Sequence, residues 1–206
     1  MISLIHAWLD AIFPPLCAIC KGKADIKCFC FSCWTKCAPP DPEERCPHCF
    51  HESEGLCKEC KKGPRLSFSR AAIFDADPSA HYLARKRADL LVDFATLQWA
   101  QLDWPLPDAI VPMHGAKNLA RDFAERIDCP FAPILKRGGW CDVEAIEEDQ
   151  VFLLIANENS VGEVREAISL LQETFPKKGF LLSLFPLSED ERNHHGGGEA
   201  PRPNKK

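Results

Sequence analysis

The sequence predicts an α/β protein in two parts, a small zinc ribbon module followed by a domain with a mostly parallel sheet. The first observation is that four Cys-x-x-Cys pairs crowd into residues 17–60. The second is that short apolar runs alternate with amphipathic helical segments after residue 66, as in α/β domains. The 206 residues suffice for one medium domain and a small one. We expect a helix over 1–13, the zinc module over 14–65, the α/β domain over 66–187 and a disordered tail over 188–206.

The cysteine pairs have the spacing of metal ligands. Two residues between cysteines let both sulfurs of one turn reach one ion, and two such turns close a tetrahedral four-thiolate site. Sequential pairing is simplest, and the metal would supply folding energy that so short a segment cannot draw from a core. We therefore expect two structural zinc ions, one held by Cys17, Cys20, Cys30 and Cys33 and the other by Cys46, Cys49, Cys57 and Cys60.

Other roles for these cysteines fit less well. Disulfides need an oxidising compartment, and no secretory signal precedes the array. A redox-active pair usually occurs once, and ribbon-like pairs favour zinc over an iron–sulfur cluster. Cys28 lies close enough to Cys30 to replace it as a ligand, so that alternative stays open. We expect ordinary thiols at Cys129 and Cys141, and Cys37 is also left over.

The net charge of -5 gives no prediction of nucleic-acid binding for the whole chain. The cysteine segment, however, is rich in basic residues. They could contact a phosphate backbone, or they could offset the negative charge of metal-bound thiolates, which the interspersed glutamates favour. The basic residues are Lys21, Lys23, Lys27, Lys36, Arg45, Lys58, Lys61, Lys62 and Arg65, and the glutamates are Glu43, Glu44, Glu52, Glu54 and Glu59.

The first residues predict an amphipathic helix over 2–13. Ile5, Trp8, Leu9 and Ile12 form its apolar stripe, and Pro14 and Pro15 stop it. Such a helix is too short to span a bilayer, and it lacks the Lys and Arg that bind anionic lipids. We expect it to pack on the chain's own core or on a partner.

The α/β domain is predicted from apolar runs and helical periodicity. The run 151–155 is the most convincing buried strand, and 109–111 is apolar and β-branched as a parallel strand would be. Further strands are predicted at 71–74, 134–135 and 180–185, and helices at 78–101, 116–126 and 161–174.

At this point a family resemblance is visible. The order of Phe13-Pro14-Pro15, the four cysteine pairs, Asp108-Ala109-Ile110-Val111-Pro112 and the strand–turn–helix over 151–174 resembles the ComF family. The resemblance covers most of the chain up to Phe185, and the cysteine array is its specific part. It implies a double zinc ribbon before a type I phosphoribosyltransferase-like (Rossmann-like) domain, and a role in uptake of single-stranded DNA during natural transformation.

The sequence departs from the family where the family binds phosphoribosyl pyrophosphate. Two acidic residues should hold the ribose hydroxyls, and a turn with threonines and glycine before a helix should cradle the 5′-phosphate. The acids fall on Ala156 and Asn157, with Glu158 one residue late. A basic loop after Pro112 is also missing. The remnant of the phosphate loop is Ala156, Asn157, Glu158, Asn159, Ser160, Val161 and Gly162.

Three hypotheses follow. The first is a ComF-like protein with an inactive phosphoribosyltransferase-like domain that acts by binding, so that no catalytic residue is assigned. The second is an active phosphoribosyltransferase that uses magnesium and atypical ligands such as Glu158, His114 and Lys117. The third is a zinc-ribbon adaptor for protein contacts. The expected partners are single-stranded DNA and DNA-uptake proteins, and the expected location is the cytoplasm or the inner face of the membrane.

Overall fold

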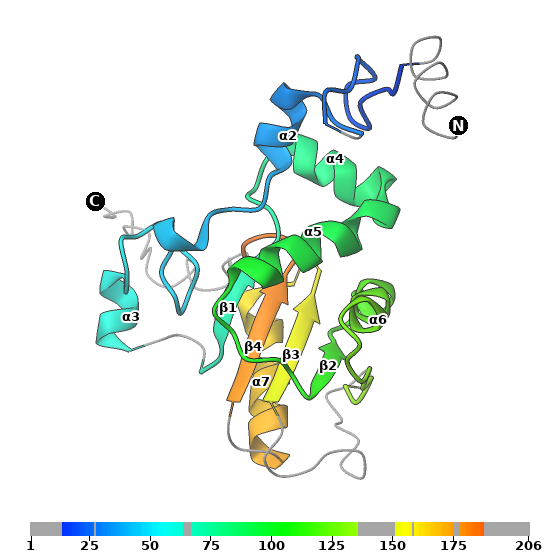
Figure 1. Cartoon of the computed structure of the whole chain (residues 1–206). Helices are drawn as coiled ribbons and strands as arrows, with labels where there is room; N and C mark the ends of the chain where they lie inside the picture. The colour runs from blue at the N-terminus through cyan, green and yellow to red at the C-terminus, as the bar shows by residue number, and fades with distance from the viewer. Residues whose placement is uncertain are drawn as a thin grey trace, which may run out of the picture.

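The computed structural model describes residues 14–26, 28–63, 67–135, 151–157, 159–174 and 178–187. Its centre is a four-stranded sheet in which all neighbouring strands are parallel, in the order β1-β4-β3-β2 (Figure 1). This confirms the predicted α/β class with a parallel sheet behind an N-terminal cysteine array. The strands are β1 (Ser69–Ala72), β2 (Ala109–Pro112), β3 (Val151–Ala156) and β4 (Lys178–Ser183).

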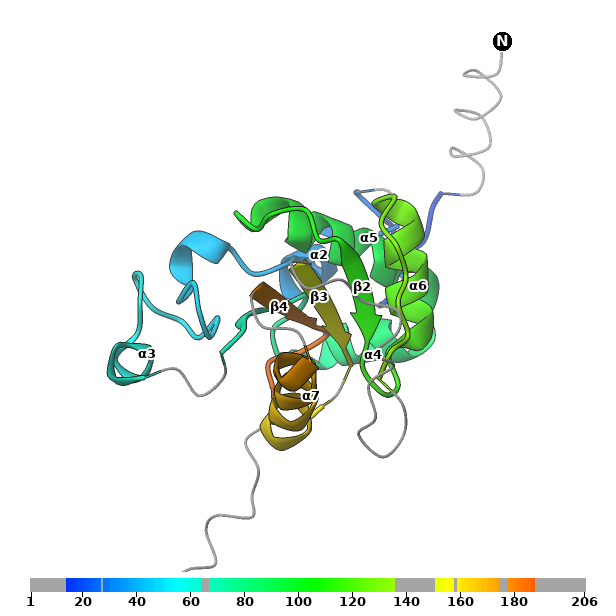
Figure 2. The ribbon, with the colours of Figure 1, turned by 90° about the horizontal axis from the view of Figure 1, so that it is seen from below.

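Helices cover both faces of this sheet (Figure 2). Successive residues of a strand point to opposite faces, so β2, β3 and β4 each feed two cores. Ile110, Leu153 and Leu182 pack into the core on the side of α5 and α6. Their neighbours Val111, Leu154 and Leu181 pack on the side of α7. Burial on both faces explains why these strands read as continuous apolar runs. The helices are α4 (Pro78–Lys86), α5 (Ala88–Gln101), α6 (Lys117–Arg126) and α7 (Val161–Thr174).

The prediction of one helix over 78–101 was wrong, because the chain turns a corner at Arg87. The Arg87 backbone leaves the helical region, with φ -136° and ψ 52°. Its guanidinium donates to both carboxylate oxygens of Asp89, at 2.9 and 2.7 Å. Asp89 lies in the first turn of α5, where a negative charge is favourable. The corner separates α4, which begins at Pro78 after the Asp77 cap, from α5, which crosses the sheet.

The first cysteine module, residues 14–40, shares the core of the α/β domain. It contains α2 (Phe31–Cys37), which packs against α4. The Phe29 ring meets the Phe94 ring of α5 edge-on at 5.7 Å between centroids, and the Trp34 ring lies 5.8 Å from the same ring. The module therefore has little core of its own, as its composition predicted, and uses that of its neighbour instead.

The second cysteine module, residues 41–63, is attached to the outer edge of β1 through mostly polar contacts. It contains η1 (Pro42–Glu44) and α3 (Lys58–Lys62), and α3 lies away from the sheet (Figure 1). The Arg70 amide donates to the His48 carbonyl at 3.0 Å, and Arg70 Nε donates to the Cys49 carbonyl at 2.8 Å. Arg45 pairs with Asp75 at 2.9 Å. One aromatic side chain, Phe50, reaches the core.

The opposite edge of the sheet is also covered. The Ile110 amide of β2 donates to Pro130 at 2.8 Å, and the Ala132 amide donates to the Ile110 carbonyl at 2.9 Å. In the strand predicted at 134–135, Ile134 is a buried core residue and Leu135 forms an isolated bridge, and no regular strand is described there.

Several predictions lie outside the described residues: the helix over 2–13, the tail over 188–206, and Cys141. Among the helices that the structure describes, none is long and apolar enough to cross a membrane.

Candidate functional site

The structure gathers the eight paired cysteines into two groups of four. Within each group the sulfur atoms lie within 4.8 Å of one another. The groups are the two predicted sets, Cys17, Cys20, Cys30 and Cys33 in the first cysteine module, and Cys46, Cys49, Cys57 and Cys60 in the second. Each group could hold one metal ion.

The sulfur separations fit a four-coordinate ion. Cys20 Sγ lies 3.7 Å from Cys30 Sγ, and Cys49 Sγ lies 3.6 Å from Cys57 Sγ. Four thiolates at 2.3 Å from a tetrahedral zinc are about 3.8 Å apart. A disulfide needs about 2.05 Å, and these cysteines are free. The donor set is therefore compatible with zinc, and no open ligand position remains for catalysis.

The same backbone turn builds the first half of each group. In the first group, the Cys17 amide donates to the Gly22 carbonyl at 2.7 Å, and the Lys21 amide donates to the Cys17 carbonyl at 3.0 Å. In the second group, the Cys46 amide donates to the His51 carbonyl at 2.8 Å, and the Phe50 amide donates to the Cys46 carbonyl at 2.9 Å. Lys21 and Phe50, which directly follow a cysteine in the two turns, both have a φ of 62°. This structural repeat explains why two unrelated stretches of sequence present their sulfurs alike.

Backbone amides favour the thiolate form of Cys17 in the first group and of Cys46 and Cys57 in the second. Burial acts to raise the pKa of Cys17, but backbone hydrogen bonds from Cys30, Cys20 and Ile19 outweigh it and lower the pKa to about 6. Cys46 has the same balance, with bonds from Cys57, Cys49 and His48, and a pKa of about 6.

Other members of each group hold their protons more firmly. Burial, with hydrogen bonds to the neighbouring thiols, raises the pKa of Cys33 to about 12 and that of Cys60 still further. A divalent cation would displace these protons, so metal affinity should rise with pH.

The remaining described cysteines stand outside the two groups. Cys28 is not among the four sulfurs of the first group, so the structure favours Cys30 over it as the ligand. Burial raises the pKa of Cys37 to about 11, with the nearby Asp77 and Cys17 charges adding to the shift. Burial likewise raises the pKa of Cys129 to about 11. The raised pKa values keep the Cys37 and Cys129 thiols protonated at neutral pH.

We expect close to two zinc ions per chain in protein purified under reducing conditions. Cys28→Ser should keep both ions, because its sulfur is not part of the first group. Cys30→Ser should lose one, because it removes a ligand. Metal analysis by mass spectrometry of the intact chain measures both. Loss of an ion from Cys28→Ser and not from Cys30→Ser would show that Cys28 is the ligand.

The phosphate-loop region lies where β3 meets α7, as predicted, at the carboxyl edge of the sheet. β3 ends at Ala156 and α7 begins at Val161. The structure brings Asn157, Asn159 and Ser160 together in the turn, and Glu158 lies outside the described residues. Asn159 is buried, and its Oδ1 accepts from the Asn157 amide at 3.0 Å. The Asn159 side chain therefore stabilises the turn.

The beginning of α7 is closed by a reciprocal cap. Glu163 Oε2 accepts from the Ser160 amide at 2.9 Å, and the Glu163 amide donates to Ser160 Oγ at 3.3 Å. This is a capping box, Ser-x-x-Glu. Sequence reasoning missed Glu163, although the spacing of Ser160 and Glu163 is its signature. The carboxylate thus accepts from the Ser160 amide, which is one of the donors that the resemblance would offer to a phosphate.

The valines of the phosphate-loop region belong to the core. Val161 and Val164 both pack into the core between α7 and the sheet. Their methyl groups replace the expected hydroxyls because α7 uses these positions for packing.

Two pockets open at the carboxyl edge of the sheet. One, of about 330 Å³, lies between the α4–α5 corner and α6 and includes Arg85, Asn118 and Asn157 in its lining. The other, of about 380 Å³, is lined by residues after β2 that include His114 and Lys117. The predicted atypical ligands His114 and Lys117 therefore share one pocket, whereas the residues of the α7 cap do not line it.

Comparison with protein-family models, with curated proteins and with solved structures finds no match for this chain.

Proposed function

We propose that this chain is a ComF-like protein with two structural zinc ions and an inactive phosphoribosyltransferase-like domain, and that it acts by binding in DNA uptake. The observation that supports the inactive domain most directly is the capping box of α7, in which Glu163 already binds the Ser160 amide. The two four-sulfur groups support the zinc assignment.

Transfer of a phosphoribosyl group requires the ribose to be fixed while charge develops at the sugar carbon. The two carboxylates that would anchor the ribose hydroxyls are absent at Ala156 and Asn157. Each lost charge-assisted hydrogen bond costs about 1.5–3 kcal/mol. Replacing the phosphate contacts by the Glu163 carboxylate adds repulsion to this loss, so useful affinity for the pyrophosphate substrate is not expected.

Calorimetry with phosphoribosyl pyrophosphate and magnesium tests the inactive domain. We expect no measurable heat from the zinc-loaded full chain, with circular dichroism confirming that it is folded. Micromolar binding that disappears in Glu158→Ala would overturn the proposal in favour of a working site in which Glu158 replaces the missing carboxylates. Binding that disappears only in Lys117→Ala would also overturn it, and would move the site to the pocket after β2.

The DNA-binding part of the proposal rests on α3. Lys58, Lys61 and Lys62 are exposed on this helix, which projects from the second cysteine module (Figure 1). Glu59 lies among them and pairs with Lys62 at 3.7 Å, which weakens the positive field. Contacts through these lysines would read the phosphate backbone and not the base sequence.

We expect single-stranded DNA to bind independently of sequence and to lose affinity steeply with salt. Three phosphate contacts give a slope of about -2 in a plot of log K against log salt. Exchanging the three lysines of α3 for glutamate should abolish this binding, measured by fluorescence anisotropy with a labelled oligonucleotide. The matched control is Arg85→Glu with Lys86→Glu, an exposed basic pair on α4. Unchanged affinity in the α3 variant would contradict the proposal.

A further inference from the structure

Three large apolar side chains surround the first cysteine group and are open to solvent. Leu16 is 60% exposed, Ile26 40% and Phe31 66%. We call these three residues the ribbon patch. Other apolar residues of the same module, Ala18 and Phe29, are buried in the shared core. The module therefore has one apolar side that is packed and one that is not.

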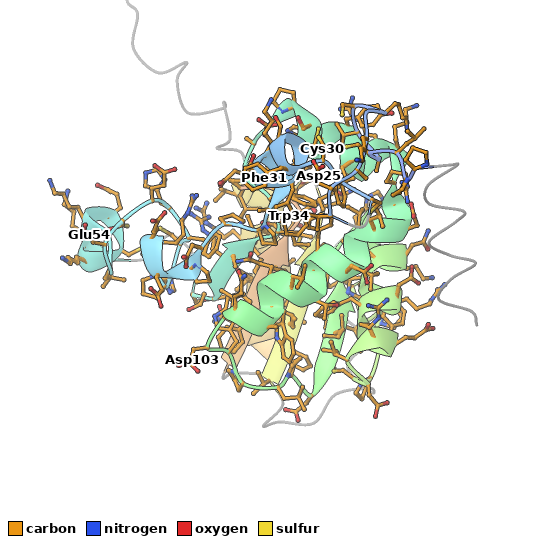
Figure 3. All side chains as sticks on the ribbon, turned by 45° about the horizontal axis from the view of Figure 1, so that its top comes forward. Asp25, Cys30, Phe31, Trp34, Glu54 and Asp103 are labelled. Atoms are coloured by element: carbon orange, nitrogen blue, oxygen red, sulfur yellow. The ribbon has the colours of Figure 1, made fainter. Side chains whose placement is uncertain are left out.

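The metal-binding turns bring together the backbone segments that carry these three residues, and the Ala18 amide donates to the Cys28 carbonyl at 2.8 Å. Leu16 precedes Cys17 and Phe31 follows Cys30, and the sulfurs of these two cysteines lie within 4.8 Å. The Phe31 amide donates to an Asp25 carboxylate oxygen at 3.1 Å, which holds Phe31 against the segment that contains Ile26. Asp25 and Phe31 lie in the same part of the module (Figure 3). Clustered exposed apolar side chains of this kind mark interaction sites.

We propose that the ribbon patch is the docking surface for residues 2–13 of the same chain. The sequence gives this segment an apolar stripe of Ile5, Trp8, Leu9 and Ile12. Such a stripe requires an apolar surface to cover it. The segment also contains no Lys or Arg and one acid, Asp10, which suits a surface with the exposed Lys23 at its border.

The connection between the segment and the ribbon patch is short and fixed. Pro14 and Pro15 alone separate residue 13 from Leu16. The Pro15 carbonyl accepts from the Ala24 amide at 2.8 Å, and Leu16 pairs with Lys23. The residues that directly follow the segment are therefore fixed beside the patch. A tether this short gives a high effective concentration, so contacts of few side chains suffice for docking.

Hydrogen exchange of the full chain with zinc tests the proposal. An isolated helix of this length is marginal in water, so protection of amides in 2–13 reports docking. We expect at least about tenfold slower exchange there than in the double variant Leu16→Ser with Phe31→Ser. The matched control is Leu97→Ser with Leu106→Ser, which changes two leucines that are 46% and 64% exposed on other parts of the chain. The control should keep the protection.

A second variant guards against damage to the metal site. If Leu16→Ser with Phe31→Ser loses zinc, the variant Trp8→Ser is used in its place, because this change leaves the metal-binding turns intact. Trp8→Ser should also remove the protection of residues 2–13. Exchange of residues 2–13 at the free-peptide rate in the natural chain would overturn the proposal. Protection that grows with protein concentration would assign the patch to a second copy, and protection that needs added phosphatidylcholine vesicles would assign the segment to lipid; both overturn intramolecular docking.

Discussion

Cys17→Ser is expected to lose one zinc and to destabilise the whole chain, not only the first cysteine module. Without its metal the module no longer holds Phe29 and Trp34 against Phe94. Each of these aromatic side chains contributes about 1.5–3 kcal/mol through burial, so the free energy of unfolding should fall by about 3–6 kcal/mol. At 2–4 °C per kcal/mol, the melting temperature should fall by roughly 6–24 °C. Thermal unfolding followed by circular dichroism measures this.

Cys57→Ser is the matched control in the second group. It should also remove one zinc, but the described residues of the second cysteine module contact the domain through half-buried polar pairs and one buried ring, that of Phe50. The melting temperature of Cys57→Ser should fall by less than half as much as that of Cys17→Ser. Equal losses in the two variants would show that the aromatic contacts with Phe94 are not what connects metal binding to the stability of the domain.

Gly179→Ala is expected to destabilise the sheet by about 1–3 kcal/mol, as overpacking of a core does. Gly179 is a buried residue of β4. A Cβ atom at this position would overlap the ring of Phe68, which is itself buried in the core on the side of α7. The backbone of β4 therefore approaches the ring as closely as a glycine allows. Urea unfolding measures the loss as a lower midpoint at unchanged m-value.

A double-mutant cycle assigns this loss to the Phe68 ring. In a Phe68→Leu background the ring is gone, and Gly179→Ala should cost less than about half of what it costs in the natural chain. Additive losses would contradict the assignment and would point to strain in β4 itself. The glycine is needed here for a close approach and not for a left-handed backbone.

The sequence predicted β2 and β3 to within one residue at each end, and it placed β1 and β4 two residues too late. Strands β2 and β3 are buried on both faces, so their apolar runs carry the signal. Strand β4 begins with Lys178 and Gly179, which do not look like part of an apolar run. Strand β1 was predicted two residues too late, because Ser69 and Arg70 are polar and look like loop. Their polarity has a tertiary cause, since Ser69 Oγ lies 3.3 Å from His48 Nδ1 and Arg70 binds the Cys49 carbonyl. The break between α4 and α5 at Arg87 also has a tertiary cause, because it depends on how α5 packs across the sheet.

The metal groups were predictable because ligand spacing is a local property of the chain. Cys30 could not be separated from Cys28 by spacing alone, since that choice depends on how the turn closed by the Ile26–Phe29 bridge directs each sulfur. The cap of α7 was predictable from the spacing of Ser160 and Glu163. The effect of this cap on anion binding could not be predicted from the sequence. It depends on the Glu163 carboxylate lying 2.9 Å from the Ser160 amide, which the proposed phosphate site would need as a donor.

The two covered edges of the sheet carry a consequence for solubility. A bare strand edge offers unpaired amides and carbonyls to another chain and promotes aggregation. The segment around Pro130 protects β2 without help from metal, whereas β1 is protected by the His48 carbonyl, between two ligands of the second group. A metal ion bound by the second group would therefore keep this edge from pairing with a second molecule. Metal depletion should show first as precipitation, while the core around α7 is still folded.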